Sequence, residues 1–244
     1  MRFFDTHLHL PTPDAAGVEA FLRFAHEEPG LIGGALILNT FEEAAAVMAS
    51  LQHFPGSVVM IPYFCQAGSV PLPLQRAGWY KVHPILHNID EAAIPSLVNS
   101  LQRQRPRGVM VHCFPWGPEL KFNISLPLVI ALARALPDTT ILATHGGGYE
   151  SWAFRSHAGA FKNVHFDFSL TLDYYEGADA LRPLQRYLRY SKSRVHFGSD
   201  WPSGRVAAQL TEMQRLAREV GLGVAELESL LLENARACWP SAFD

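Results

Sequence analysis

The chain has 244 residues, of which 48% are hydrophobic and 18% are charged, and its formal net charge is −3. A chain of this length can bury roughly 70–75% of the surface that its unfolded form exposes, so residues 1–244 are expected to form a single domain. The small negative charge argues against a nucleic-acid partner, and three cysteines, an odd number, exclude a disulfide framework.

Short β-rich runs alternate along the chain with segments of helical periodicity. The predicted strands are Arg2–His7, Leu31–Asn39, Ser57–Phe64, Gly78–His83, Arg107–His112, Thr139–His145, Asn163–Ser169 and Arg194–Ser199. The predicted helices are Asp14–Glu27, Phe41–Phe54, Glu91–Arg103, Ser125–Leu136, Glu150–Phe161, Asp179–Tyr190, Ser203–Val220 and Ala225–Ala237. A Pro-rich loop, Gln66–Leu74, takes the place of a full helix after the third strand.

Eight strands that alternate with helices predict parallel strands with right-handed crossovers. A (β/α)8 barrel uses about 30 residues for each unit, as this chain does, so we predict an α/β fold of the TIM-like barrel type. The alternative, a doubly wound open sheet, predicts a glycine-rich turn after the first strand. The first strand here ends in His7-Leu8-His9 without a glycine, which favours the barrel.

Histidine or aspartate follows an apolar run at the ends of four predicted strands. These residues are His7 and His9, His112, His145, and Asp200. In a barrel the carboxyl ends of the strands surround one opening, and polar residues there are typical of catalysis. His7 and His9 are two residues apart and therefore share a face of their strand. Imidazole and carboxylate together suit zinc, manganese, iron or cobalt rather than calcium, so we expect one divalent ion, with zinc as the first candidate.

Five motifs in this order resemble the amidohydrolase superfamily, most closely its amidohydrolase-related (amidohydrolase 2) branch of metal-dependent hydrolases and decarboxylases. They are Asp5–His9, Gly78–Pro84, Val109–His112, Ile141–Gly147 and Phe197–Pro202. The resemblance implies a distorted barrel with a metal ion at its opening. It also implies that His7, His9, His112 and Asp200 ligate the metal, with His145 as a further ligand or in contact with the water at the metal.

Lys81 has two interpretations under this resemblance. Relatives with two metal ions use a carboxylated lysine from the fourth strand as a bridge, and Lys81 lies near that place in the sequence. The one-metal branch does not require such a bridge. Lys81 is then an inward lysine that pairs with an acid or that binds a charged group of the substrate.

The function predicted from these residues is hydrolysis of a small molecule such as a lactone, an amide or an ester, or of a carboxylated ring. A bound divalent ion can lower the pKa of water from about 15.7 to about 7. Asp200 is then expected to take the proton of that water, and His145 to orient the water or to stabilise the developing oxyanion. The alternative is a non-oxidative decarboxylase or hydratase with the same metal site.

The sequence gives fewer indications of the substrate and of other partners. Aromatic residues in the predicted loops, Trp116 among them, suit a planar ring, while Lys81 and Arg155 are the candidates for binding a substrate charge. No apolar run approaches the roughly 20 residues of a membrane helix, and the N-terminal segment lacks the apolar stretch of a signal peptide. We therefore expect a cytoplasmic protein without a membrane partner and leave a homodimer open.

Overall fold

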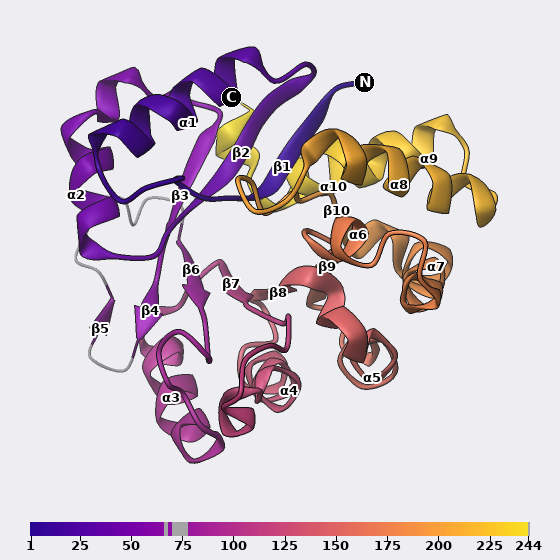
Figure 1. Cartoon of the computed structure of the whole chain (residues 1–244). Coiled ribbons are helices and arrows are strands. Elements are labelled where there is room, and N and C mark those ends of the chain that lie inside the picture. Colours follow the sequence, from indigo (N-terminus) through magenta and orange to yellow (C-terminus); the bar gives the residue numbers. More distant parts are fainter. Residues whose placement is uncertain (66–67, 70–77, 244) are drawn as a thin grey trace.

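A computed structural model describes residues 1–65, 68–69 and 78–243. Eight parallel strands correspond to the eight predicted ones, and helices surround them (Figure 1). These strands are β1 (Phe3–Leu8), β2 (Leu31–Leu38), β3 (Val58–Pro62), β6 (Trp79–Val82), β7 (Gly108–Val111), β8 (Thr140–Ala143), β9 (Val164–Asp167) and β10 (Val195–His196). A short antiparallel hairpin, β4 (Phe64–Cys65) and β5 (Gly68–Ser69), was not predicted. Most of the Pro-rich loop Gln66–Leu74 lies outside the described residues.

The eight parallel strands divide into two sheets that meet at both edges. One sheet has the order β1-β2-β3 and the other β10-β9-β8-β7-β6. Tyr63, just after β3, forms a parallel bridge with Lys81 of β6, and Leu8 of β1 forms one with Trp201. The predicted α/β fold is therefore confirmed, and the distortion of the barrel lies at these two junctions, where single bridges replace continuous pairing.

Most predicted helices are present, with boundaries that differ by a few residues. They are α1 (Ala15–Glu27), α2 (Phe41–Ala49), α3 (Ile94–Gln104), α4 (Ser125–Ala135), α5 (Ser151–His157), α7 (Arg182–Ser191) and α8 (Val206–Glu219). The last predicted helix, Ala225–Ala237, consists of α9 (Val224–Glu228), a π-helical turn (Ser229–Glu233) and α10 (Asn234–Cys238). The short helix α6 (Thr171–Tyr174) was not predicted.

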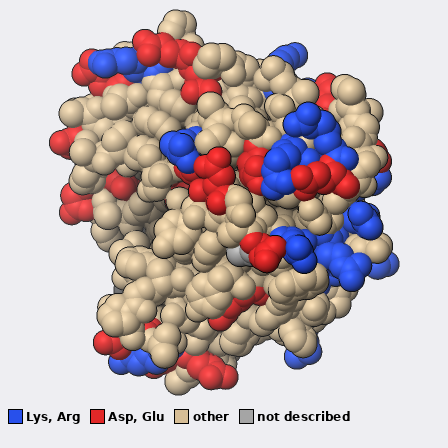
Figure 2. Space-filling model, turned by 45° about the vertical axis from the view of Figure 1, so that its right-hand side comes forward, with Lys and Arg blue, Asp and Glu red and all other residues tan. Residues whose placement is uncertain are grey.

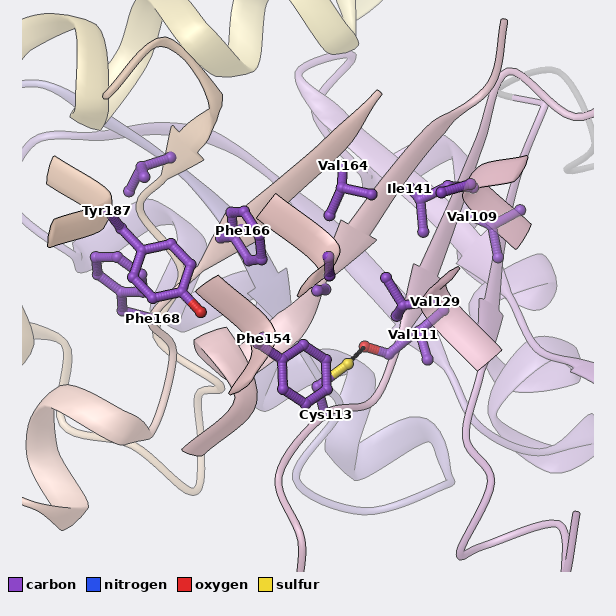
Figure 3. Packing of buried hydrophobic residues seen from close by; sticks show 14 of the residues in the cluster. Val109, Val111, Cys113, Val129, Ile141, Phe154, Val164, Phe166, Phe168 and Tyr187 are labelled. Carbon is purple, nitrogen blue, oxygen red and sulfur yellow. Dashed lines mark hydrogen bonds between the residues drawn. The ribbon is translucent and has the colours of Figure 1, made fainter. Parts of the chain in front are cut away.

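Side chains that point outward from the strands pack against the surrounding helices (Figure 3). Val111 and Ile141 from the strands and Phe154 from α5 belong to this fully buried layer. Tyr187 of α7 also donates its hydroxyl to the carbonyl oxygens of Gly146 (3.1 Å) and Ser151 (2.8 Å). Because Gly146 follows β8, this contact fixes the loop that carries His145.

The amino-terminal ends of the strands enclose an apolar cluster. Phe4 of β1, Trp79 of β6 and Met110 of β7 belong to it, together with Trp239, which follows α10. The Trp239 ring lies 4.5 Å from that of Trp79 and 5.7 Å from that of Phe4. This end of the strands is therefore filled, and the polar residues gather at the other end. In the part of the chain that the structure describes, no helix is long and apolar enough to cross a membrane.

Candidate metal centre

The carboxyl ends of the first and last strands bring His7, His9 and Asp200 together. Oδ1 of Asp200 lies 3.3 Å from Nε2 of His7 and 3.3 Å from Nε2 of His9. Two ligands of a tetrahedral ion with bonds of 2.0–2.1 Å are about 3.3 Å apart, so the observed spacing suits a metal ion. Three of the five predicted metal ligands thus converge on one point.

The hydrogen bond that His7 donates through Nδ1 leaves the lone pair of its ring on Nε2. Ser169 donates its hydroxyl to the Asp167 carboxylate, so its oxygen accepts the Nδ1–H of His7 at 2.8 Å. Burial, followed by the charge of Lys81, lowers the pKa of His7 to about 3, and the ring is neutral. Nε2 therefore carries a lone pair that faces the carboxylate of Asp200. Two such atoms repel each other unless a proton or a cation lies between them.

His112 and His145 form a second pair of facing nitrogens beside this cluster. Nδ1 of His145 donates to the carbonyl oxygen of Ser169 (2.9 Å), and Nε2 of His112 donates to that of Phe114 (3.1 Å). Burial lowers the pKa of both rings, so each carries a single proton. That proton is used in the bond to the carbonyl. Nδ1 of His112 and Nε2 of His145, 3.1 Å apart, therefore face each other as two lone pairs.

The backbone adopts left-handed conformations at two of these residues. His145 has φ of 63° and Asp200 has φ of 61°, in a region that residues other than glycine seldom adopt. Three glycines with positive φ, Gly146–Gly148, follow His145. Such strain of about 1–3 kcal/mol for each residue is typical of functional sites. The conformation turns both side chains back over the strand ends.

Two buried carboxylates hold the surrounding backbone in place. Asp5 accepts hydrogen bonds from the amides of His7 (3.0 Å) and Ser199 (2.9 Å). Burial raises the pKa of Asp5 to about 7. Asp167 accepts from the amides of His145 and Ser169, both at 3.0 Å. These bonds fix the strand ends that carry the candidate ligands.

Lys81 lies directly against His7. Its Nζ is 3.1 Å from Nε2 of His7 and 3.3 Å from the hydroxyl of Thr144. Burial lowers the pKa of the Lys81 amine to about 8, so this amine is mostly protonated at neutral pH. Lys81 therefore brings a cationic or readily neutralised amine to the base of the site.

A cavity of about 560 Å³ opens above these residues. Its wall includes the candidate ligands His7, His9, His112 and Asp200, together with Lys81 and Trp116, and further His83, Tyr63, Phe114 and Tyr174. The ring of His83 stacks on that of His112 at 3.8 Å. Arg155 is not among the described residues that line the cavity, since its guanidinium lies over the ring of Tyr190, 5.8 Å from the centroid. The sequence thus placed Lys81 and Trp116 at the cavity, whereas the structure directs Arg155 elsewhere.

Two supporting residues were not singled out from the sequence. Ser169 fixes the rings of both His7 and His145, whereas the sequence shows only that this serine ends the seventh predicted strand. Asn39 lies with its amide 3.1 Å from Nδ1 of His9, and its own Oδ1 is buried without a partner among the described atoms. Rotation of this amide by 180° lets Oδ1 accept the Nδ1–H of His9. Nε2 of His9 then carries no hydrogen and presents its lone pair to Asp200.

Comparisons with known proteins concern the family and the fold of the chain. The family model described as "Amidohydrolase" matches residues 6–240. Among solved structures, an uncharacterised TIM-barrel protein from Bordetella bronchiseptica has a TM-score of 0.72 at 13% identity and covers 100% of both chains. A zinc-bound amidohydrolase from Burkholderia multivorans has a TM-score of 0.64 at 17% identity, over 98% of this chain and 99% of the other. A search of curated proteins finds no match.

Proposed function

This chain belongs to the amidohydrolase family, and on that basis we propose that it is a metal-dependent hydrolase of a small organic substrate. Family membership supports an activity of the hydrolase or decarboxylase type. The observation that carries the proposal is a set of nitrogen and oxygen atoms at the strand ends that face one another with their lone pairs. Oδ1 of Asp200 faces Nε2 of His7, which the Lys81 amine also approaches at 3.1 Å. Nδ1 of His112 faces Nε2 of His145 without a proton between them. A divalent cation between His7, His9 and Asp200 relieves the first contact. Ligation of the same ion by His112 and His145 is part of the proposal.

The residues proposed to hold the ion are His7, His9, His112, His145 and Asp200. Zinc is the first candidate, supported by neutral imidazoles with one carboxylate and by the zinc in the similar structure from Burkholderia multivorans. Manganese, iron and cobalt suit the same ligands. A bound ion supplies Lewis acidity and makes water more acidic at neutral pH.

Asp200 is proposed to accept the proton of the attacking water. Burial alone raises the pKa of this carboxyl, but the neighbouring His7 and His9 outweigh burial and hold the pKa well below its usual range. The carboxylate is therefore ionised throughout the neutral range. His145, which is fixed through Ser169, is proposed to orient the water or to stabilise the oxyanion that forms on the substrate.

Lys81 and Trp116 are proposed to bind the substrate. The volume of about 560 Å³ lies within the usual range for small-molecule sites, and the aromatic side chains offer flat walls for a ring. Lys81 at the base of the cavity is placed to bind a carboxylate or a developing negative charge. On the face drawn in Figure 2, acidic and basic side chains lie beside one another between broad uncharged areas, which suits a small substrate better than a polyanion.

A lactone, an amide or an ester is the proposed substrate class. A non-oxidative decarboxylase of a small carboxylic acid is the second candidate, because Lys81 lies beside the ligand His7, where a substrate carboxylate could bind. The two activities differ in their products. Release of carbon dioxide identifies the decarboxylase, and cleavage of the lactone, ester or amide bond by water identifies the hydrolase.

Metal analysis combined with a substrate panel tests the proposal. The purified protein and the His9→Asn/Asp200→Asn variant are compared by elemental analysis and then assayed on lactones, esters, amides and aromatic carboxylic acids. We expect bound metal and turnover in the wild type, with loss of the strand-end metal and of turnover in the variant. Equal metal content and equal turnover in both proteins would refute the proposed centre.

A further inference from the structure

A second group of metal-binding side chains lies outside the cavity. His165 is on β9, His196 is on β10, and Cys238 is the last residue of α10. Their ligand atoms lie within 4.8 Å of one another. All three residues stand apart from the centre described above, and no step of the proposed reaction uses them. No sequence motif groups these residues, because Cys238 is 73 residues from His165 and 42 from His196.

The three atoms form a triangle of suitable size for one metal ion. Nδ1 of His165 is 2.8 Å from Nε2 of His196, and Sγ of Cys238 is 3.9 Å from the first nitrogen and 4.0 Å from the second. A point in this plane is about 2.1 Å from all three atoms, compared with about 2.0–2.1 Å for Zn–N bonds and about 2.3 Å for Zn–S bonds. A small displacement from the plane lengthens all three distances. The two nitrogens are closer than the about 3.3 Å that separates two ligands of a tetrahedral ion, so the two rings must move apart by about 0.5 Å when an ion binds.

The protonation states of the three groups also suit a metal site. Burial lowers the pKa of His165 to about 4, with a further contribution from Arg194, and lowers the pKa of His196 well below its ordinary value. Both rings are therefore neutral at neutral pH. The two facing nitrogens share a single proton, whose place an ion can take. Burial raises the pKa of the Cys238 thiol to about 12, so an ion must displace the thiol proton, and binding strengthens as pH rises.

The surroundings allow an ion to enter and favour a soft one. His165 and Cys238 are only half-buried, whereas His196 is fully buried. Thiolate and imidazole together select zinc or Cu⁺ rather than calcium or magnesium. Cu⁺ suits the site because it accepts three ligands and because the thiolate cancels its charge. The resulting neutral complex is compatible with partial burial and with the nearby positive charge of Arg194. Zn²⁺ fits the same triangle with water as its fourth ligand.

From this geometry we infer that His165, His196 and Cys238 bind one thiophilic metal ion, Zn²⁺ or Cu⁺, at a site separate from the catalytic centre. The ion joins the end of α10 to strands β9 and β10. Trp239 follows Cys238 directly and packs in the apolar cluster at the amino-terminal ends of the strands. The ion therefore holds the segment that closes this end of the barrel, and its role is to stabilise the fold.

Cobalt titration tests the site independently of catalysis, because a thiolate bound to Co²⁺ gives a charge-transfer absorption in the near ultraviolet. We expect this absorption in the wild type and equally in His9→Asn/Asp200→Asn, in which the catalytic centre is disabled. We expect none in Cys238→Ser. Cys113→Ser is the matched control, since Cys113 is a buried free cysteine that does not belong to the group of three ligands, and its serine keeps the bond to the carbonyl of Val111.

The ion itself is identified by two further titrations. Zn²⁺, or Cu⁺ under reducing and oxygen-free conditions, is added to the metal-free His9→Asn/Asp200→Asn protein, and the Tm is measured with and without the Cys238→Ser change. A rise in Tm that requires Cys238 supports the site, and the ion that produces this rise is identified as the bound metal. Circular dichroism of each variant confirms that it folds. Absence of the cobalt band in the wild type, its persistence in a folded Cys238→Ser protein, or equal Tm shifts with and without Cys238 would overturn the inference.

Discussion

Replacement of Asp200 by asparagine separates the chemistry of this residue from its part in the fold. The backbone amide of Asp200 donates to the carbonyl of His7 at 2.8 Å, and an asparagine keeps that bond. Asparagine also tolerates the left-handed conformation, here with φ of 61°, about as well as aspartate does. Alanine at this position would add backbone strain of about 1–2 kcal/mol. Asp200→Asn should therefore leave the Tm nearly unchanged.

The loss of the carboxylate should instead appear in turnover. Oδ1 of Asp200 is the atom that lies 3.3 Å from both His7 and His9, and an amide supplies neither its charge nor its basicity. General-base catalysis alone contributes about 10²- to 10⁴-fold, which corresponds to about 2.7–5.4 kcal/mol of transition-state stabilisation. Loss of a metal ligand adds to this effect. We expect kcat/KM to fall by at least two orders of magnitude.

The assay compares kcat/KM of the wild type, Asp200→Asn and Asp138→Asn on the best substrate of the panel. Asp138 is exposed in the loop between α4 and β8, so its replacement controls for the loss of one negative charge. Metal content and Tm are measured on the same samples. If Asp200→Asn binds metal and retains the turnover of Asp138→Asn, then Asp200 is not the base and the proposed mechanism fails.

Three further substitutions test the supporting structure. Ser169→Ala removes the acceptor 2.8 Å from Nδ1 of His7 and should weaken metal binding about 10- to 100-fold in a chelator competition. The circular dichroism spectrum should stay unchanged, and an unaltered metal affinity would mean that the serine does not orient the ring. Thr40→Ala removes the cap of α2, in which Thr40 and Glu43 bond each other's backbone, and should lower the free energy of unfolding by about 1 kcal/mol, or the Tm by about 2–4 °C. Trp239→Ala leaves a cavity against Phe4 and should cost about 3–5 kcal/mol in urea unfolding; a loss below 1 kcal/mol would contradict the packing seen here.

The strand ends were predictable because they depend on local patterns. Two-residue periodicity places His7 and His9 on one face, and the rule that parallel strands end on the same side brings Asp200 to them. The alternation of strands and helices likewise gave the fold class without knowledge of any contact. The structure then added what periodicity cannot express, namely which nitrogen of each ring faces its neighbour. That depends on Ser169, which is 162 residues from His7.

Arg155 shows where reasoning from the sequence fails. Its place shortly after the sixth strand suggested the cavity, but the turn at Thr144–Glu150 determines where α5 begins and how it is rotated. Gly147 has φ of 89°, and a Cβ there would lie 2.4 Å from the ring of Phe154. This close approach sets α5 against the loop and directs Arg155 toward Tyr190 of α7. The direction of a helical side chain thus depends on packing that the sequence does not show.

The two ends of the barrel use histidine for opposite purposes, and position decides between them. At the carboxyl ends, His145 and Asp200 adopt left-handed conformations that few residues accept, and Asp200 lines an open cavity. At the other end, His165 and His196 lie within regular strands and face a cysteine of the closing segment. Backbone strain of this kind is typical of functional sites. Under the two proposals, the same residue type binds a catalytic ion at one end of the barrel and a stabilising ion at the other.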